Sequence, residues 1–430
     1  MFNPSDIMNA LSQISETGGA DCERRCILHV EGLFKEAGIP TSIIAPDSDS
    51  PVLYAKIRSY APRLSPLLLY ARAGGTASWG NEPAAEALAE GRVRSLSPDG
   101  LKAGAAVFSS VLLNLRESRT RMPYDIILLL ACGEGDAGGV KLVTGKHPKL
   151  FKDIKYALGE IGGFPLLIGP KKLYPIMIAE KRQAWLRVTA GRQKHSGPMS
   201  GLAKAIIRLE RKRLPVRVSE PVSLMAEALG GALGELDEIM MSLMQKPLLT
   251  LPMQKLMGKE GRFFAPLMRN SVSVNLLRGG NDINVKPETA YFDADMRLVP
   301  GLSVGEGVSD VRAVIGSAYE IDVLRGGVMG RNLDMAMFEG LANALVKRDP
   351  DAAPIPYVNA VPTDARYLEE LGIQSYGYAP MNLPVNGDMT SKSKSAIKQA
   401  REDALDFGVA CLTYFLISRD SDSALNSSGV

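Results

Sequence analysis

The chain has 430 residues, of which 46% are hydrophobic and 23% are charged, a composition typical of folded globular proteins and unlike that of disordered or collagenous ones. Its 50 Lys and Arg residues against 47 Asp and Glu residues give a net charge of +3, which argues against a strongly basic nucleic-acid-binding surface. The four cysteines are too few to cross-link a chain of this length, so we expect free thiols in a reducing compartment. The sequence contains neither a secretory signal pattern nor an apolar run long enough to span a bilayer. We therefore expect a cytoplasmic protein that binds neither nucleic acid nor membrane.

The first part of the chain alternates predicted helices with apolar strands. The spacing of apolar residues predicts helices at 7–14, 22–35 and 101–115. The predicted strands are the near-continuous apolar runs 52–57, 66–71 and 124–131. Apolar strands separated by helices indicate a parallel or mixed sheet that is covered by helices on both faces.

The middle of the chain has a different pattern. Residues 184–192 alternate apolar and polar side chains like a half-buried antiparallel strand, and two further alternating strands follow at 272–277 and 289–298. Helices are predicted near 202–209 and 224–236. Strands with one solvated face indicate a small α+β domain inserted into the larger one.

The doubly wound pattern returns after Gly326. Residues 333–346 and 396–416 are predicted helices, and 375–379 are a predicted strand. The predicted domains are an α/β domain at 1–180 and 328–430, an inserted lid at 181–327, and a polar, disordered tail at 418–430.

A glycine-rich loop follows the predicted strand 124–131. Residues 133–138 (GEGDAG) match the pattern G-x-G-x-x-G, which lets backbone N–H groups approach a pyrophosphate. However, the loop's two acids repel phosphate, and the segment after it is a poor helix start. Dinucleotide binding therefore stays a minor alternative.

Only three histidines are available for a metal site or for catalysis: His29, His147 and His195. A two-metal hydrolase needs about five His, Asp or Glu ligands, so the supply is small. His195 lies in a loop between a predicted strand and a helix. There an exposed imidazole can donate a hydrogen bond to a developing oxyanion, and a plain surface histidine is the alternative.

Six segments, in order along the chain, resemble the co-catalytic zinc peptidase and amidohydrolase family that includes aminoacylase, carnosinase, acetylornithine deacetylase and succinyl-diaminopimelate desuccinylase. The segments are 66–78, 79–104, 125–139, 185–198, 281–301 and 361–380. They are similar to the family's His-x-Asp strand, its Asp-x-Lys-Gly motif, its Glu-Glu strand, the opening of its lid, an Asn-Val-x-Pro segment and a Thr-Asp-x-Arg unit. The resemblance implies a doubly wound mixed sheet with an inserted α+β lid that mediates a homodimer.

The departures from the family pattern fall on the metal site. Arg72 stands in place of the first His ligand, Gly100 in place of the bridging Asp, and Asn386 in place of the last His. Only Glu134 remains of the Glu-Glu pair, and the next acidic ligand would fall near 168–170, which has no carboxylate. The family uses two zinc ions, which one carboxylate cannot hold. We therefore predict no metal cofactor.

The half of the site that contacts substrate resembles the family more closely. His195 matches the lid histidine that, in the family, reaches into the partner subunit and binds the scissile carbonyl oxygen. Segments similar to those that contact substrate contain Asn275, Asn284, Thr363 and Arg366. Of these, Arg366 can take a carboxylate bidentately. Arg72 either supplies a fixed positive charge to a ligand or fills the vacated hole and pairs with Glu134.

Three functions remain in competition. The favoured one is a zinc-free relative that binds a small peptide or an N-acyl amino acid without hydrolysing it. The alternative is a metal-independent or single-metal enzyme that hydrolyses or forms an amide bond, with Glu134 as base and with His195 and Arg72 at the oxyanion. In that version Cys132 is a remote candidate nucleophile. The third is the nucleotide-binding interpretation of the glycine-rich loop.

Overall fold

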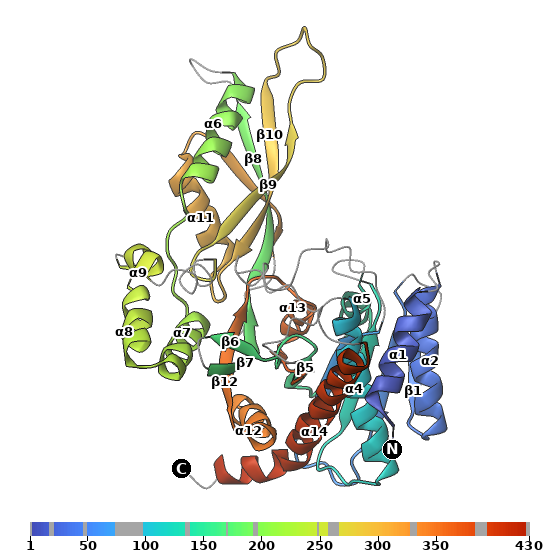
Figure 1. Ribbon diagram of the computed structural model, residues 1–430. Coiled ribbons are helices and arrows are strands. Elements are labelled where there is room, and N and C mark those ends of the chain that lie inside the picture. Colours follow the sequence, from blue (N-terminus) through green and yellow to red (C-terminus); the bar gives the residue numbers. More distant parts are fainter. Residues whose placement is uncertain are drawn as a thin grey trace.

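The computed structural model describes residues 2–16, 21–45, 50–73, 98–133, 138–168, 171–191, 197–246, 249–256, 266–326, 333–382 and 394–426. These residues form two sheets, a larger mixed one and a smaller antiparallel one that stands at the top of Figure 1. The predicted fold class, an α/β protein with a mixed sheet and a second α+β unit, is confirmed. None of the described helices has both the length and the apolar character that crossing a bilayer requires.

The larger sheet has the strand order β1-β2-β4-β3-β5-β13-β7-β12, and β6 pairs with β7. Its strands are β1 (Thr41–Ile44), β2 (Val52–Ile57), β3 (Leu67–Arg72), β4 (Ile126–Ala131), β5 (Tyr156–Gly159), β6 (Leu166–Ile168), β7 (Lys171–Glu180), β12 (Ala352–Asn359) and β13 (Gln374–Gly377). The central strands β4, β3, β5 and β13 run parallel, so their carboxyl ends meet at one edge of the sheet. Loops at that edge are the usual place for ligand sites in open α/β sheets.

Helices cover both faces of the larger sheet because its strands are apolar on both sides. On β3, Leu67 and Leu69 pack into one core, and Leu68 and Tyr70 pack into the other. The first core is completed by α1 (Pro4–Glu16), α2 (Cys22–Glu36), α4 (Pro98–Glu117), α12 (Phe338–Arg348) and α14 (Lys394–Asn426). The second is completed by α5 (Gly139–Lys146), the short 3-10 helix Pro148–Phe151, α7 (Glu220–Leu233), α8 (Glu235–Met244), α9 (Thr250–Leu256) and α13 (Ala365–Glu369).

The smaller sheet and two helices form the lid. Its strands β8 (Arg182–Gly191), β9 (Ser271–Arg278), β10 (Thr289–Leu298) and β11 (Glu320–Gly326) are ordered β11-β8-β10-β9. Helices α6 (Pro198–Arg211) and α11 (Val304–Ile315) cover one face. Along β8, Leu186 and Val188 are buried between more exposed neighbours, as the alternating sequence predicts.

Two segments differ from the sequence-based expectation. The helices at 220–256, predicted as part of the lid, lie beside the larger sheet in Figure 1, and Val222 and Met225 share a core with Val358 of β12. The second is the tail: α14 continues to Asn426, although a disordered tail was predicted from Ser418. The guanidinium of Arg419 lies 4.2 Å from the ring centroid of Tyr124, which attaches the helix beyond Ser418 to the larger unit.

Candidate functional site

The carboxyl ends of β3 and β5 bring three charged side chains together, here called the Arg72 cluster: Arg72, Glu160 and Asp364. Arg72 ends β3, and Glu160 follows β5, the strand that pairs with β3. The backbone N–H of Arg72 donates to Oε2 of Glu160 at 2.7 Å. The Nε of Arg72 lies 3.4 Å from Oδ2 of Asp364 and 3.9 Å from Oε1 of Glu160. The guanidinium therefore lies against two carboxylates.

The Arg72 cluster is largely removed from water. The exposed fractions of the side chains are 17% for Arg72, 7% for Glu160 and 6% for Asp364. Charges in such surroundings are stable only when they are paired, which these are. The space left between them is about 10 Å³, enough for about one water molecule.

Thr363 and Arg366 lie close to Asp364 in the sequence. Thr363 precedes α13, and Arg366 is in its first turn. Thr363 lines the small space beside Arg72, and its N–H donates to Oε2 of Glu180 at 2.8 Å. Arg366 donates from Nη1 to Oε1 of Gln183 at 3.1 Å and from Nη2 to the hydroxyl of Tyr367 at 2.7 Å. Arg366 therefore connects α13 to β8 through two of its five N–H donors, and its buried Nε–H has no hydrogen-bond partner in the described part of the chain.

This architecture matches known proteins. Residues 178–323 match the family model of the M20 peptidase dimerisation domain. The YXEP protein of Bacillus subtilis, a dinuclear metal-binding peptidase from the M20 family, aligns with a TM-score of 0.55 at 10% identity, over 96% of this chain and 98% of its own. The M20 family metallo-carboxypeptidase Sso-CP2 from Sulfolobus solfataricus gives 0.55 at 16% identity, over 96% and 98%. Human carnosine dipeptidase 1 gives 0.51 at 14% identity, over 92% and 91%.

The chain has the M20 peptidase fold, with the family's dimerisation domain. This confirms the resemblance predicted from the six segments. No curated protein sequence matches the chain. At 10–16% identity the M20 structures establish the fold, and the chemistry has to be argued from this chain's own residues.

Two of the positions at which the resemblance places metal ligands, Arg72 and Gly100, lie in the described part of the chain. A guanidinium has only donor groups and keeps its proton, so Arg72 cannot ligate a metal at the position where the resemblance places the first ligand. Within the described ranges, no group of three or more His, Cys, Asp and Glu side chains is arranged to hold a metal. Gly100 lies in the first turn of α4, whereas Glu134, His195 and Asn386 lie outside the described residues.

Glu160 is the site residue that sequence reasoning missed. The next acidic ligand was expected near 168–170, where no carboxylate exists, but the strand that neighbours β3 is β5, and Glu160 follows it directly. The signal was present in the short apolar run before Glu160. Four residues ending in glycine were not recognised as a strand, so Glu160 was not connected with Arg72.

Asn275 and Asn284 lie in the dimerisation domain, away from the Arg72 cluster of the same chain. Asn275 is exposed on β9, the edge strand of the smaller sheet. Asn284 is in the loop after β9, which Figure 1 shows at the end of the lid remote from the larger sheet. The structure therefore brings Thr363 to Arg72, places Arg366 beside them, and separates both asparagines from them.

The residues around the glycine-rich loop give no support to a nucleophilic thiol. Cys132 is fully buried after β4, and its Sγ–H donates to the carbonyl oxygen of Glu23 at 3.5 Å. Burial, with the nearby Glu23 charge adding to it, raises the pKa of this thiol far above neutrality, so it stays protonated and a poor nucleophile. The expectation of a poor helix start after the loop is wrong, because α5 begins at Gly139.

Proposed function

We propose that this M20-fold protein lacks the dinuclear zinc site and binds a small peptide or an N-acyl amino acid without hydrolysing it. The observation that carries the proposal is the Arg72 cluster. A guanidinium replaces the first metal ligand and is held by Glu160 and Asp364. Zinc lowers the pKa of a bound water to about 7, and a guanidinium has no comparable effect, so the replacement removes the nucleophile that the fold's hydrolytic members need.

The ligand class follows from the residues that remain. Arg72 and Thr363 lie at the carboxyl edge of the sheet, where a carboxylate or an amide oxygen finds donors. His195 resembles the family's carbonyl-binding histidine and would supply a further donor from the lid. These groups can bind an acyl or a carboxylate group without performing chemistry on it.

We further propose that the protein is a homodimer through the lid, in the cytoplasm. β9 pairs with β10 and is an edge strand of the smaller sheet in the described part of the chain, and its end and following loop expose Leu277, Ile283 and Val285. We expect Ile283→Asp to convert a dimer to a monomer in sedimentation velocity. Leu236→Asp, which changes an exposed leucine of α8, is the matched control and should leave the dimer intact.

The decisive experiment is metal analysis by plasma mass spectrometry after dialysis against excess zinc and then against zinc-free buffer. We expect no stoichiometric zinc. One or more zinc ions per chain together with amide hydrolysis would refute the proposal. Hydrolysis that persists without metal and is lost in Glu134→Gln would instead establish the metal-independent enzyme.

Ligand binding is tested by thermal shift with N-acetyl amino acids and dipeptides, since a ligand that binds the native state raises the melting temperature. We expect His195→Ala to reduce the shift and His147→Ala, which changes an exposed histidine between α5 and the 3-10 helix, to leave it unchanged. Equal shifts in both variants would remove His195 from the ligand site.

A further inference from the structure

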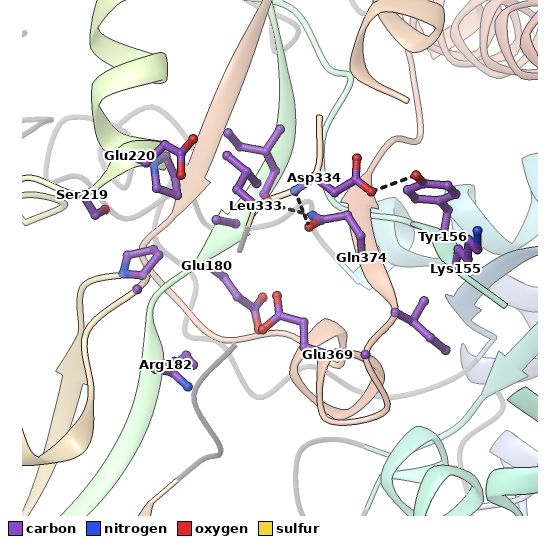
Figure 2. A pocket seen from close by; sticks show the side chains of 17 residues that line it. Lys155, Tyr156, Glu180, Arg182, Ser219, Glu220, Leu333, Asp334, Glu369 and Gln374 are labelled. Atoms are coloured by element: carbon purple, nitrogen blue, oxygen red, sulfur yellow. Dashed lines mark hydrogen bonds between the residues drawn. The ribbon is translucent and has the colours of Figure 1, made fainter. Parts of the chain in front are cut away.

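A cavity of about 650 Å³, the Glu180 cavity, lies where the larger unit meets the lid. It opens at the amino-terminal ends of β5 and β13, beside Tyr156 and Gln374, whereas the Arg72 cluster lies beyond the other end of β5. Figure 2 shows Glu180 and Arg182, which flank the passage from β7 to β8, on its wall. Its volume is typical of sites for small organic molecules.

Glu180 is buried at this cavity with an unsatisfied oxygen. The residue is 3% exposed, and its Oε2 accepts the hydrogen bond from Thr363. Its Oε1 has no hydrogen-bond partner. In Figure 2 the carboxylates of Glu180 and Glu369 point toward one another. A buried acceptor without a donor is unfavourable, so a ligand that supplies the donor gains binding free energy there.

The electrostatic surroundings favour a positive ligand. Burial, and then repulsion from Glu369, raises the pKa of Glu180. Burial also raises the pKa of Glu369, and Arg182 opposes that shift. The pair therefore retains a proton near neutral pH.

Further charges face this pair from the surrounding elements. The charged side chains that line the cavity are Glu180, Glu220, Asp334 and Glu369 against Lys155 and Arg182. From α13, Arg366 acts on Glu180 and Glu370 acts on Glu369. The hydroxyl of Tyr156 donates to Asp334 at 2.8 Å. With four carboxylates on the wall and two cationic side chains, the lining has an acidic excess that attracts cations.

We propose that the Glu180 cavity binds a small organic cation through a primary ammonium group placed between Glu180 and Glu369. An ammonium carries three N–H donors, which suits Oε1 of Glu180 and the facing carboxylate of Glu369. The proton that the pair holds passes to solvent on binding, while the amine keeps its own. Ile178, Pro221 and Ile373 supply apolar wall for an aliphatic chain. The cavity opens on the other side of Glu180 from Thr363, whose N–H donates to this carboxylate and which belongs to the ligand site of the proposed function.

Isothermal titration calorimetry of the full chain with n-butylamine tests this proposal. We expect binding that tightens about tenfold between about pH 6 and about pH 8.5, because the pair loses its proton while the amine stays charged. We also expect a heat that depends on the buffer, which reports the proton released. Butyrate, which has a similar chain and the opposite charge, should not bind.

Variants locate the binding. Glu180→Gln keeps the acceptor for Thr363 and removes the charge, so it should fold and lose at least tenfold in affinity for n-butylamine, as should Glu369→Gln. Glu36→Gln on α2, an equal change of charge that does not line the cavity, should bind like the unmodified chain. Absence of n-butylamine binding, or equal binding in Glu180→Gln, overturns the proposal. Stabilisation by calcium chloride and not by the amine would also overturn it, because the site would then hold a metal ion.

Discussion

At the carboxyl end of β5, the guanidinium of Arg72 lies against Glu160 and Asp364 around a space of about 10 Å³. Near its amino end, Glu180 and Glu369 face each other at a cavity of about 650 Å³. Both regions bury charge, but in the first a guanidinium lies between the carboxylates, whereas in the second the two carboxylates face each other beside open space. The contact between Arg72 and its two carboxylates stabilises the fold. The facing carboxylates of Glu180 and Glu369 lie beside open space, so a bound cation would gain favourable interactions with them.

The largest expected effect comes from Arg72→Gln. Removal of the guanidinium leaves Glu160 and Asp364 as buried neighbours of like charge, and we expect a loss of about 3–5 kcal/mol in the free energy of unfolding at neutral pH. Urea denaturation followed by circular dichroism measures it. Part of the loss should be recovered on acidification, when the carboxylates take up protons. A loss below about 1 kcal/mol would show that the cluster is not a stabilising pair.

The second effect has the opposite sign. Glu180→Gln should stabilise the chain by about 1–3 kcal/mol near pH 8, because it removes a buried charge. Since the folded-state pKa of Glu180 is raised, the unmodified chain binds more protons than its unfolded state above about pH 4.5, and its stability falls as pH rises through that folded-state pKa. The gain should therefore be small near pH 4 and grow with pH in thermal melts. A gain that is the same at both pH values would contradict this account.

The smallest effect is expected at an exposed pair in the lid. Arg187 donates to Asp293 at 2.7 and 2.8 Å, but the side chains are 34% and 23% exposed. We expect Arg187→Gln to lower the free energy of unfolding far less than Arg72→Gln does, and this loss to shrink in high salt. Urea denaturation at low and high salt measures both. If Arg187→Gln lowered the free energy of unfolding as much as Arg72→Gln does, burial would not determine how much an ion pair contributes to stability here.

Much of the fold could be predicted from hydrophobic patterns. The strands Val52–Ile57 and Thr289–Leu298 have the predicted bounds, since the first is apolar except for Lys56 and the second alternates. The strands β7 and β12 were not recognised because Pro175, Pro354 and Pro356 interrupt the strand signal, and proline disfavours strand interiors. Tertiary pairing overrides that local preference here.

The site was predictable only in part. Arg72 was identified because its segment resembles a motif, but its partners Glu160 and Asp364 lie 88 and 292 residues away along the chain. Such contacts depend on strand order, which local spacing does not specify. The Glu180–Glu369 pair was not predicted either, because Glu180 becomes buried only when α13 packs beside the passage from β7 to β8.

The return of α7 to the larger sheet has a mechanical consequence. The lid is joined to the larger unit not only at β7–β8 but also through the segments before α7 and before β9, where Val216 and Arg269 form a β-bridge. The buried ammonium of Lys181 donates to the carbonyl oxygens of Pro266 and Arg269, and so ties these passages to one another. A rotation of the lid relative to the larger unit would have to change the backbone conformation of all these connecting segments at once. Several connections that are bonded to one another therefore join the two units, and they restrict rotation of the lid more than a single hinge would.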